Sequence, residues 1–213
     1  ISKQGYQDYS GILNVKENDP TILSATLEKH KAEQAVVNTP STTSDESRKV
    51  ITVGNVSFTM IRVDGGTFTM GATSEQGSDA YSNEKPAHQV TLSPYYIGET
   101  EVTQALWEAV MGNNPSSFKG SNNPVEMVSW DDCQLFIRKL NQSTGLSFRL
   151  PTEAEWEYAV RGGNKSRGYK YSGSNILKDV AWYDNNSGSS THDVKTKQAN
   201  ELGLYDMSGN GWE

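Results

Sequence analysis

A short, well-capped helix is encoded by Arg149-Leu-Pro-Thr-Glu-Ala-Glu-Trp-Glu-Tyr-Ala-Val-Arg-Gly-Gly163. The hydroxyl of Thr152 can accept from the backbone N–H of Glu155, and the Glu155 carboxylate can accept from the Thr152 N–H. Such a reciprocal capping box stabilises a helix by about 1 kcal/mol. Arg161 places a positive charge near the end of the helix, where the dipole favours it. Because Gly162 and its neighbour supply a left-handed turn, we predict a helix over residues 152–161.

Hydrophobic periodicity predicts the remaining elements. Alternating or β-branched runs indicate strands at residues 50–53, 56–63, 66–70, 90–92 and 95–97. Apolar stripes indicate helices at residues 103–111 and 131–141, the second with Ser129 as N-cap and Asp132 completing its capping box. From residue 162 onward, Gly, Ser and Asn dominate, and we expect little regular structure. The pattern indicates a loop-rich α+β fold.

Five blocks of the chain, in this order and at these separations, resemble the formylglycine-generating enzyme (sulfatase-modifying factor) family. Four of them are Gly65-Gly-Thr-Phe-Thr-Met-Gly71, Glu101-Val-Thr-Gln-Ala-Leu-Trp107, Pro124-Val-Glu-Met-Val-Ser-Trp130 and Asn200-Glu-Leu-Gly-Leu-Tyr-Asp-Met-Ser-Gly-Asn-Gly-Trp-Glu213, and the fifth is the capped helix. The resemblance covers roughly residues 55–213. It implies the C-type-lectin-like fold of the formylglycine-generating enzyme type.

Three segments are expected along the chain. Residues 1–30 resemble the last hairpin of PEGA-type β-modules, which occur in bacterial envelope proteins, so we expect a short β-hairpin remnant and further chain before Ile1. Residues 31–50 form a polar linker without apolar periodicity. Residues 51–213 form the family domain, which we expect to be incomplete at its C-terminus. This organisation indicates a periplasmic or surface location in a bacterial envelope.

Composition excludes several classes of function. A formal charge of −7 and a pI near 5.1, with no clustered lysines or arginines, argue against nucleic-acid binding. No apolar run is long enough to span a bilayer. A single cysteine, Cys133, excludes an internal disulfide framework and a cysteine metal cluster.

Cys133 is predicted to be a core residue. It lies on the apolar stripe of the helix at 131–141, beside Phe136 and Ile137. Catalytic members of the family convert a cysteine of sulfatases to formylglycine, with copper and oxygen, at two neighbouring cysteines in the C-terminal part of the domain. Cys133 matches neither position. We therefore assign no catalytic residue in this chain, and we expect copper only if a cysteine pair lies downstream of residue 213.

The block Asp206-Met-Ser-Gly-Asn-Gly-Trp-Glu213 is a candidate metal site. Two carboxylates with glycines between them can gather oxygen atoms around one ion, and oxygen-only ligation suits Ca²⁺. The resemblance implies a structural calcium ion held by the side chains of Asp206 and Glu213 and the carbonyls of Gly209 and Gly211. Gly211 stands where the family usually has valine or alanine, which matters little for a carbonyl ligand. The alternative is an ordinary turn with two solvated acids.

Aromatic and histidine residues give weaker indications. Trp107, Trp130 and Trp156 belong to family blocks on helices, which favours core packing. Trp182, with Tyr183, Asn185 and Asn186, is the better candidate for an exposed recognition surface. His30, His88 and His192 are too widely spaced to ligate a metal from one element, so we expect surface or hydrogen-bonded structural roles.

The function that follows is a non-catalytic binding or structural module of a bacterial envelope protein, with a protein or glycan ligand. The alternative is a formylglycine-generating oxidoreductase that acts on sulfatases and has its cysteine pair downstream of residue 213. The presence of a second cysteine in the catalytic position distinguishes the two.

Overall fold

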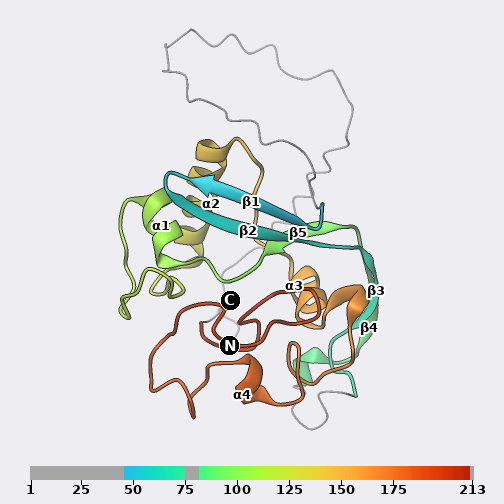
Figure 1. The fold of residues 1–213 in the computed structure, drawn as a ribbon. Coiled ribbons are helices and arrows are strands. Elements are labelled where there is room, and N and C mark those ends of the chain that lie inside the picture. The colour runs from blue at the N-terminus through green and yellow to red at the C-terminus, as the bar shows by residue number, and fades with distance from the viewer. Residues whose placement is uncertain (1–45, 75–81, 212–213) are drawn as a thin grey trace, which may run out of the picture. The chain divides into compact units, whose positions relative to one another are not determined.

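The computed structural model describes residues 46–74 and 82–211 (Figure 1). The predicted PEGA-like tail at residues 1–30 and most of the linker at 31–50 lie outside the described residues. The first strand, β1 (Arg48–Val53), begins three residues before the predicted start of the family domain. The last three linker residues therefore belong to the folded sheet.

A three-stranded antiparallel sheet has the order β1-β2-β5 and contains β2 (Val56–Val63) and β5 (Tyr95–Gly98). The β1–β2 hairpin closes where Val53 pairs with Val56, and Gly54 takes the positive φ of 61° that the tight turn requires. A separate two-stranded antiparallel sheet joins β3 (Gly66–Met70) to β4 (His88–Leu92). All five strands expected from the sequence are present.

Three helices are present where the sequence predicts them, and two carry the predicted capping boxes. Helix α1 (Gln104–Met111) begins after the N-cap Thr103. Helix α2 (Trp130–Thr144) has the Ser129–Asp132 capping box and ends at Gly145, with φ 70°. Helix α3 (Glu153–Val160) has the Thr152–Glu155 capping box and is followed by Gly162, with φ 86°. Predicted boundaries are correct to within three residues.

Beyond α3 the chain is mostly loop, as expected. Between α3 and residue 211 the structure has two short helices, η3 (Gly163–Lys165) and α4 (Leu177–Val180). Another short helix, η2 (Ser82–Glu84), precedes β4. Figure 1 shows these C-terminal loops, drawn in orange and red, on the side of the sheet away from α1 and α2.

Two core clusters lie on opposite faces of the sheet. The first joins the β1–β2 hairpin to α1 and α2; it contains Val53, Leu106, Trp107, Phe136 and Leu140, and the Trp107 and Phe136 rings stack with centroids 5.0 Å apart. The second joins β2 and α3 to the C-terminal loop and contains Ile61, Ala159, Leu204 and Met207. Since the second cluster includes residues 204 and 207, burial of apolar surface fixes the loop that carries the candidate metal block.

The tryptophan predictions were correct at two positions and wrong at one. Trp107 is buried and Trp156 packs against the second cluster. Trp130, however, is 67% exposed. It occupies the first turn of α2, one turn before Cys133, and the core contacts of this helix begin only at Cys133.

Candidate functional site

Asp206 carries a buried carboxyl oxygen that lacks a hydrogen-bond donor among the described residues. The residue is 2% exposed and has a φ of 63°, uncommon for a non-glycine residue. Its Oδ2 atom accepts from the backbone N–H of Lys195 at 2.8 Å, whereas Oδ1 is buried without a partner. Burial raises the pKa of this carboxyl. A buried carboxyl oxygen without a donor is stabilised when the carboxyl is protonated or when a cation binds to it.

Neighbouring contacts hold the block after Asp206 in one conformation. The Gly209 N–H donates to the Asp206 carbonyl, and the Asn210 N–H donates to the Trp182 carbonyl at 2.9 Å. Glu101 accepts from the Gly211 N–H at 2.8 Å and from the Asn210 side chain at 2.9 Å. Glu101, in the loop before α1, therefore orders a segment more than one hundred residues away in sequence.

A side chain on either glycine of the block would meet a close neighbour. A Cβ atom on Gly209 would lie 2.3 Å from the backbone oxygen of Trp182, and one on Gly211 would lie 2.6 Å from Oε1 of Glu101. The departure from valine or alanine at residue 211 thus has a structural reason, because glycine admits the Glu101 carboxylate.

These residues fit a hard cation in part. Oδ1 of Asp206 is a buried carboxyl oxygen without a donor in the described part of the chain, and Gly209 and Gly211 follow it within five residues. Carboxylate and backbone carbonyl oxygens are the ligands that Ca²⁺ prefers. Glu213, the fourth predicted ligand, lies outside the described residues. Within residues 46–74 and 82–211, no three His, Cys, Asp or Glu side chains come together in a metal-binding group. Any ion here would therefore depend on carbonyl oxygens.

Cys133 does not offer the surroundings of a copper ligand. Cys133 is the single cysteine of the sequence, and it packs against the first core cluster from near the start of α2. Burial raises the pKa of its thiol, which disfavours the thiolate that copper would need. The prediction of a structural Cys133 is supported.

Trp182 presents neither ring face to a ligand. The His192 imidazole stacks on one face with centroids 3.8 Å apart, and the Lys197 ammonium lies 3.9 Å from the ring centroid. The indole N–H donates to Thr196. The Asn186 side chain also makes internal hydrogen bonds: it donates to the Ala181 carbonyl and accepts from the Tyr183 N–H. Within the predicted recognition surface, Trp182 and Asn186 therefore serve internal contacts, whereas Asn185 is exposed. His192 also bonds the Ser187 carbonyl, in keeping with its predicted role.

An exposed apolar surface lies elsewhere, on the loop between α1 and α2 and the start of α2. Three exposed apolar side chains lie in this region, and we call them the apolar patch: Phe118 is 43% exposed, Met127 71% and Trp130 67%. Met127 has a φ of 61°. Sequence reasoning missed this patch because Trp130 belongs to a family block on a helix, which favoured core packing.

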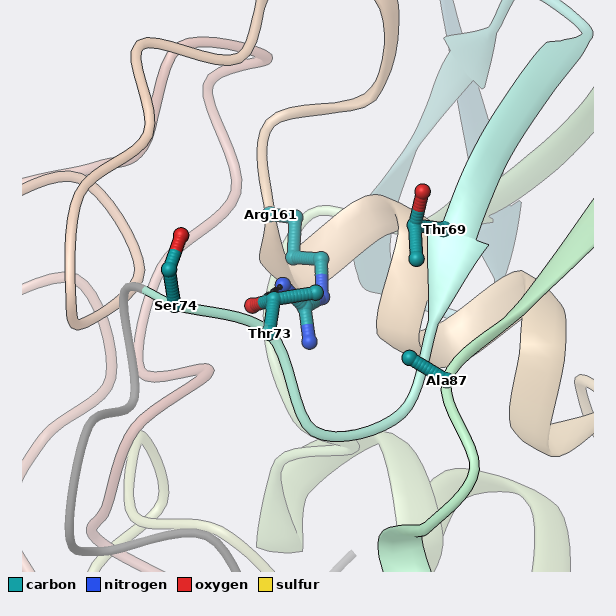
Figure 2. A pocket seen from close by; sticks show the side chains of 5 residues that line it. All are labelled: Thr69, Thr73, Ser74, Ala87 and Arg161. Carbon is teal, nitrogen blue, oxygen red and sulfur yellow. Dashed lines mark hydrogen bonds between the residues drawn. The ribbon is translucent and has the colours of Figure 1, made fainter.

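A small cavity of about 420 Å³ lies beside α3 and the loop after β3, lined by Thr69, Thr73, Ser74, Ala87 and Arg161 (Figure 2). The Arg161 guanidinium already donates to Thr73 and to the Gly71 carbonyl, each at 2.8 Å, and pairs with Glu157. Figure 2 shows Arg161 and Thr73 pointing toward each other. Because these bonds tie α3 to the β3 loop, we assign Arg161 a structural role.

None of the helices formed by the described residues has both the length and the apolar character to cross a bilayer.

Residues 51–213 match the family described as sulfatase-modifying factor enzyme 1-like domain. The chain is 37% identical to the chaperone protein LppX of Paenibacillus barcinonensis, over 75% of this chain and 72% of that protein. It is 29% identical to the formylglycine-generating enzyme of Streptomyces coelicolor, over 72% of this chain and 67% of the enzyme.

Among solved structures, Treponema denticola variable protein 1 superposes with a TM-score of 0.68 at 39% identity, over 76% of this chain and 74% of that one. PvdO from Pseudomonas aeruginosa superposes with a TM-score of 0.59 at 25% identity, over 75% and 70% of the two chains. Five sequence blocks, the observed fold and these matches agree. The chain belongs to the formylglycine-generating enzyme (sulfatase-modifying factor) family.

Proposed function

We propose that this domain is non-catalytic and that it binds protein through the apolar patch of Phe118, Met127 and Trp130. The observation that carries the proposal is the exposure of these three side chains on the loop between α1 and α2 and in the first turn of α2. Methionine and aromatic side chains are enriched in protein interfaces, and tryptophan is frequent among the residues that dominate binding energy. A protein ligand is favoured over a glycan because both faces of Trp182 are already covered.

Gln104 holds the loop that presents the patch. Its side chain is 1% exposed and donates to the carbonyls of Phe118 and Pro124, at 2.7 and 3.1 Å. Its oxygen accepts from the Asn114 side chain and the Gly120 N–H. Binding residues placed on an ordered loop lose little entropy when a partner docks.

Contacts around Glu126 hold the Phe118 backbone near the segment that carries Met127. The Glu126 carboxylate accepts from the Phe118 N–H at 2.8 Å, and the Glu126 N–H donates to Ser116. Asp131 and Asp132 are exposed next to Trp130. The patch is therefore bordered by acidic groups, which favours a partner segment that combines apolar and basic side chains.

Relatives with different functions share this fold, so the function of this domain has to be inferred from its own residues. Formylglycine generation, the alternative, would need a cysteine pair downstream of residue 213, because residues 1–213 contain Cys133 alone. The similarity to a protein named as a chaperone supports binding to other proteins. The resemblance of residues 1–30 to PEGA-type modules supports a place in a bacterial envelope. We also propose a structural Ca²⁺ at Asp206, Gly209, Gly211 and Glu213, supported by the unpartnered Oδ1 of Asp206.

The test is aggregation of reduced insulin, followed by light scattering, as a probe with exposed apolar segments. The wild-type chain should delay aggregation, and the double variant Met127→Ser, Trp130→Ser should lose that effect. Ile176→Ser is the matched control, because Ile176 is also exposed, at 53%, but lies outside the patch. Equal protection by the wild type and the double variant would overturn the assignment of the patch.

A further inference from the structure

A second cavity, of about 380 Å³, lies against the β1-β2-β5 sheet. It is on the face that α1 and α2 pack against, at the β5 end, which these helices do not cover. Lys49 on β1 pairs directly with Met60 on β2, and Tyr96 on β5 pairs with Arg62, two residues further along. Cross-strand partners point to the same face. Lys49, Met60 and Tyr96 therefore share the sheet face that forms one wall of this cavity.

The opposite wall comes from the segment between α2 and α3. Leu146 and Phe148 line the cavity from this side, and the Phe148 ring packs on Phe58 with centroids 5.8 Å apart. Ile51 lies on the sheet wall beside Met60. The walls are mainly aliphatic and aromatic, which is the composition of small-molecule pockets, and the volume lies in the range of such pockets.

Two cations border the cavity, and their surroundings differ. Arg149 donates from both Nη atoms to Glu155, at 2.6 and 2.7 Å, so its charge is balanced. The Lys49 ammonium lies 4.0 Å above the Tyr96 ring centroid, and no carboxylate among the described residues forms an ion pair with it. Lys49 is therefore the charge available to an anionic ligand.

We propose that this cavity binds an aliphatic monoanion such as a medium-chain fatty acid, with its tail between Met60, Leu146 and Phe148 and its carboxylate on Lys49. A volume of 380 Å³ accommodates about a dozen heavy atoms at roughly 30 Å³ each. This site is separate from the apolar patch and does not depend on the proposed function.

The experiment is isothermal titration calorimetry of the full chain with decanoate, decyltrimethylammonium and 1-decanol. Decanoate should bind, and the two ligands without a negative charge should bind at least tenfold more weakly. Lys49→Gln should weaken decanoate binding about tenfold. Lys178→Gln, at an exposed position on α4, should leave it unchanged.

A second pair of variants tests the apolar wall without disturbing the core. Leu146 is 48% exposed, and Leu146→Asp places a negative charge at the cavity, so decanoate binding should be lost. Leu150→Asp, in the same segment but outside the lining, should bind normally, as should the Met127→Ser, Trp130→Ser variant. Unchanged affinity in Lys49→Gln or Leu146→Asp, or equal binding of decyltrimethylammonium, would overturn the proposal.

Discussion

The carboxylate of Glu155 serves two interactions at once, because Arg149 donates to both of its oxygens while the Thr152 N–H donates to Oε2 at 2.8 Å. One side chain therefore caps α3 and ties the segment after α2 to it. The Glu155 carbonyl also accepts from the Tyr95 hydroxyl on β5. The sequence predicts the cap, whereas the contacts with Arg149 and Tyr95 depend on the fold.

Glu155→Gln should lower the free energy of unfolding by about 1–2 kcal/mol, because it weakens the cap and the charged pair. The Arg149 side chain is 61% exposed, which limits the contribution of the pair. Hydrogen bonding from Arg149 lowers the pKa of Glu155, although burial opposes this. The stabilisation is therefore present above the ordinary carboxyl pKa and is lost as pH falls through the lowered value.

Urea unfolding at pH 7 and at successively more acidic pH measures this effect. The difference between wild type and Glu155→Gln should shrink toward acid. Glu153→Gln, exposed in the same first turn, is the control and should cost only a few tenths of a kcal/mol. A pH-independent difference would show that the carboxylate charge contributes nothing.

Alanine at the two glycines of the metal block should have unequal effects. Gly209→Ala meets the Trp182 backbone oxygen, which cannot move without shifting the chain, whereas Gly211→Ala meets the end of the Glu101 side chain. We expect a cost of about 2–3 kcal/mol for the first and about 1 kcal/mol for the second, measured by urea denaturation. The reverse order would contradict the packing described for residue 211.

Calcium should raise the thermal unfolding midpoint by several degrees, reversed by a chelator, because it binds the folded state alone. Asp206→Asn should remove the shift, and Asp193→Asn, an exposed acid in the adjoining loop, should keep it. Since burial raises the pKa of Asp206, its ionisation destabilises the cation-free fold as pH rises through that value. The calcium effect should therefore grow with pH, and an absent shift in the wild type would remove the metal proposal.

Gln104→Leu keeps the side-chain volume but leaves the partners of Gln104 without hydrogen bonds inside the loop. We expect a loss of about 2–4 kcal/mol in unfolding free energy and a loss of insulin protection, because the patch is no longer ordered. Gln134→Leu, a partly exposed position on α2, is the matched control and should change stability by less than about 0.5 kcal/mol. If Gln104→Leu still protected insulin fully, binding by the apolar patch would not depend on the order of the loop.

Local signals explain what the sequence could predict. The capping boxes at Ser129 and Thr152 act within one turn, so the helix starts followed from residues three apart. The exposure of Trp130 could not be predicted, because it depends on where the neighbours of α2 end. The buried Oδ1 of Asp206 and the contact of Gly211 with Glu101 also join distant segments, and only the folded chain brings them together.

The most direct test of the non-catalytic assignment is incubation of the chain with copper, oxygen and a cysteine-containing sulfatase peptide, followed by mass spectrometry. With a single, partly buried cysteine, the chain should leave the peptide thiol unconverted, and Cys133→Ala should behave like the wild type. Repeated conversion of the peptide cysteine to formylglycine by the wild type, abolished in Cys133→Ala, would contradict the account.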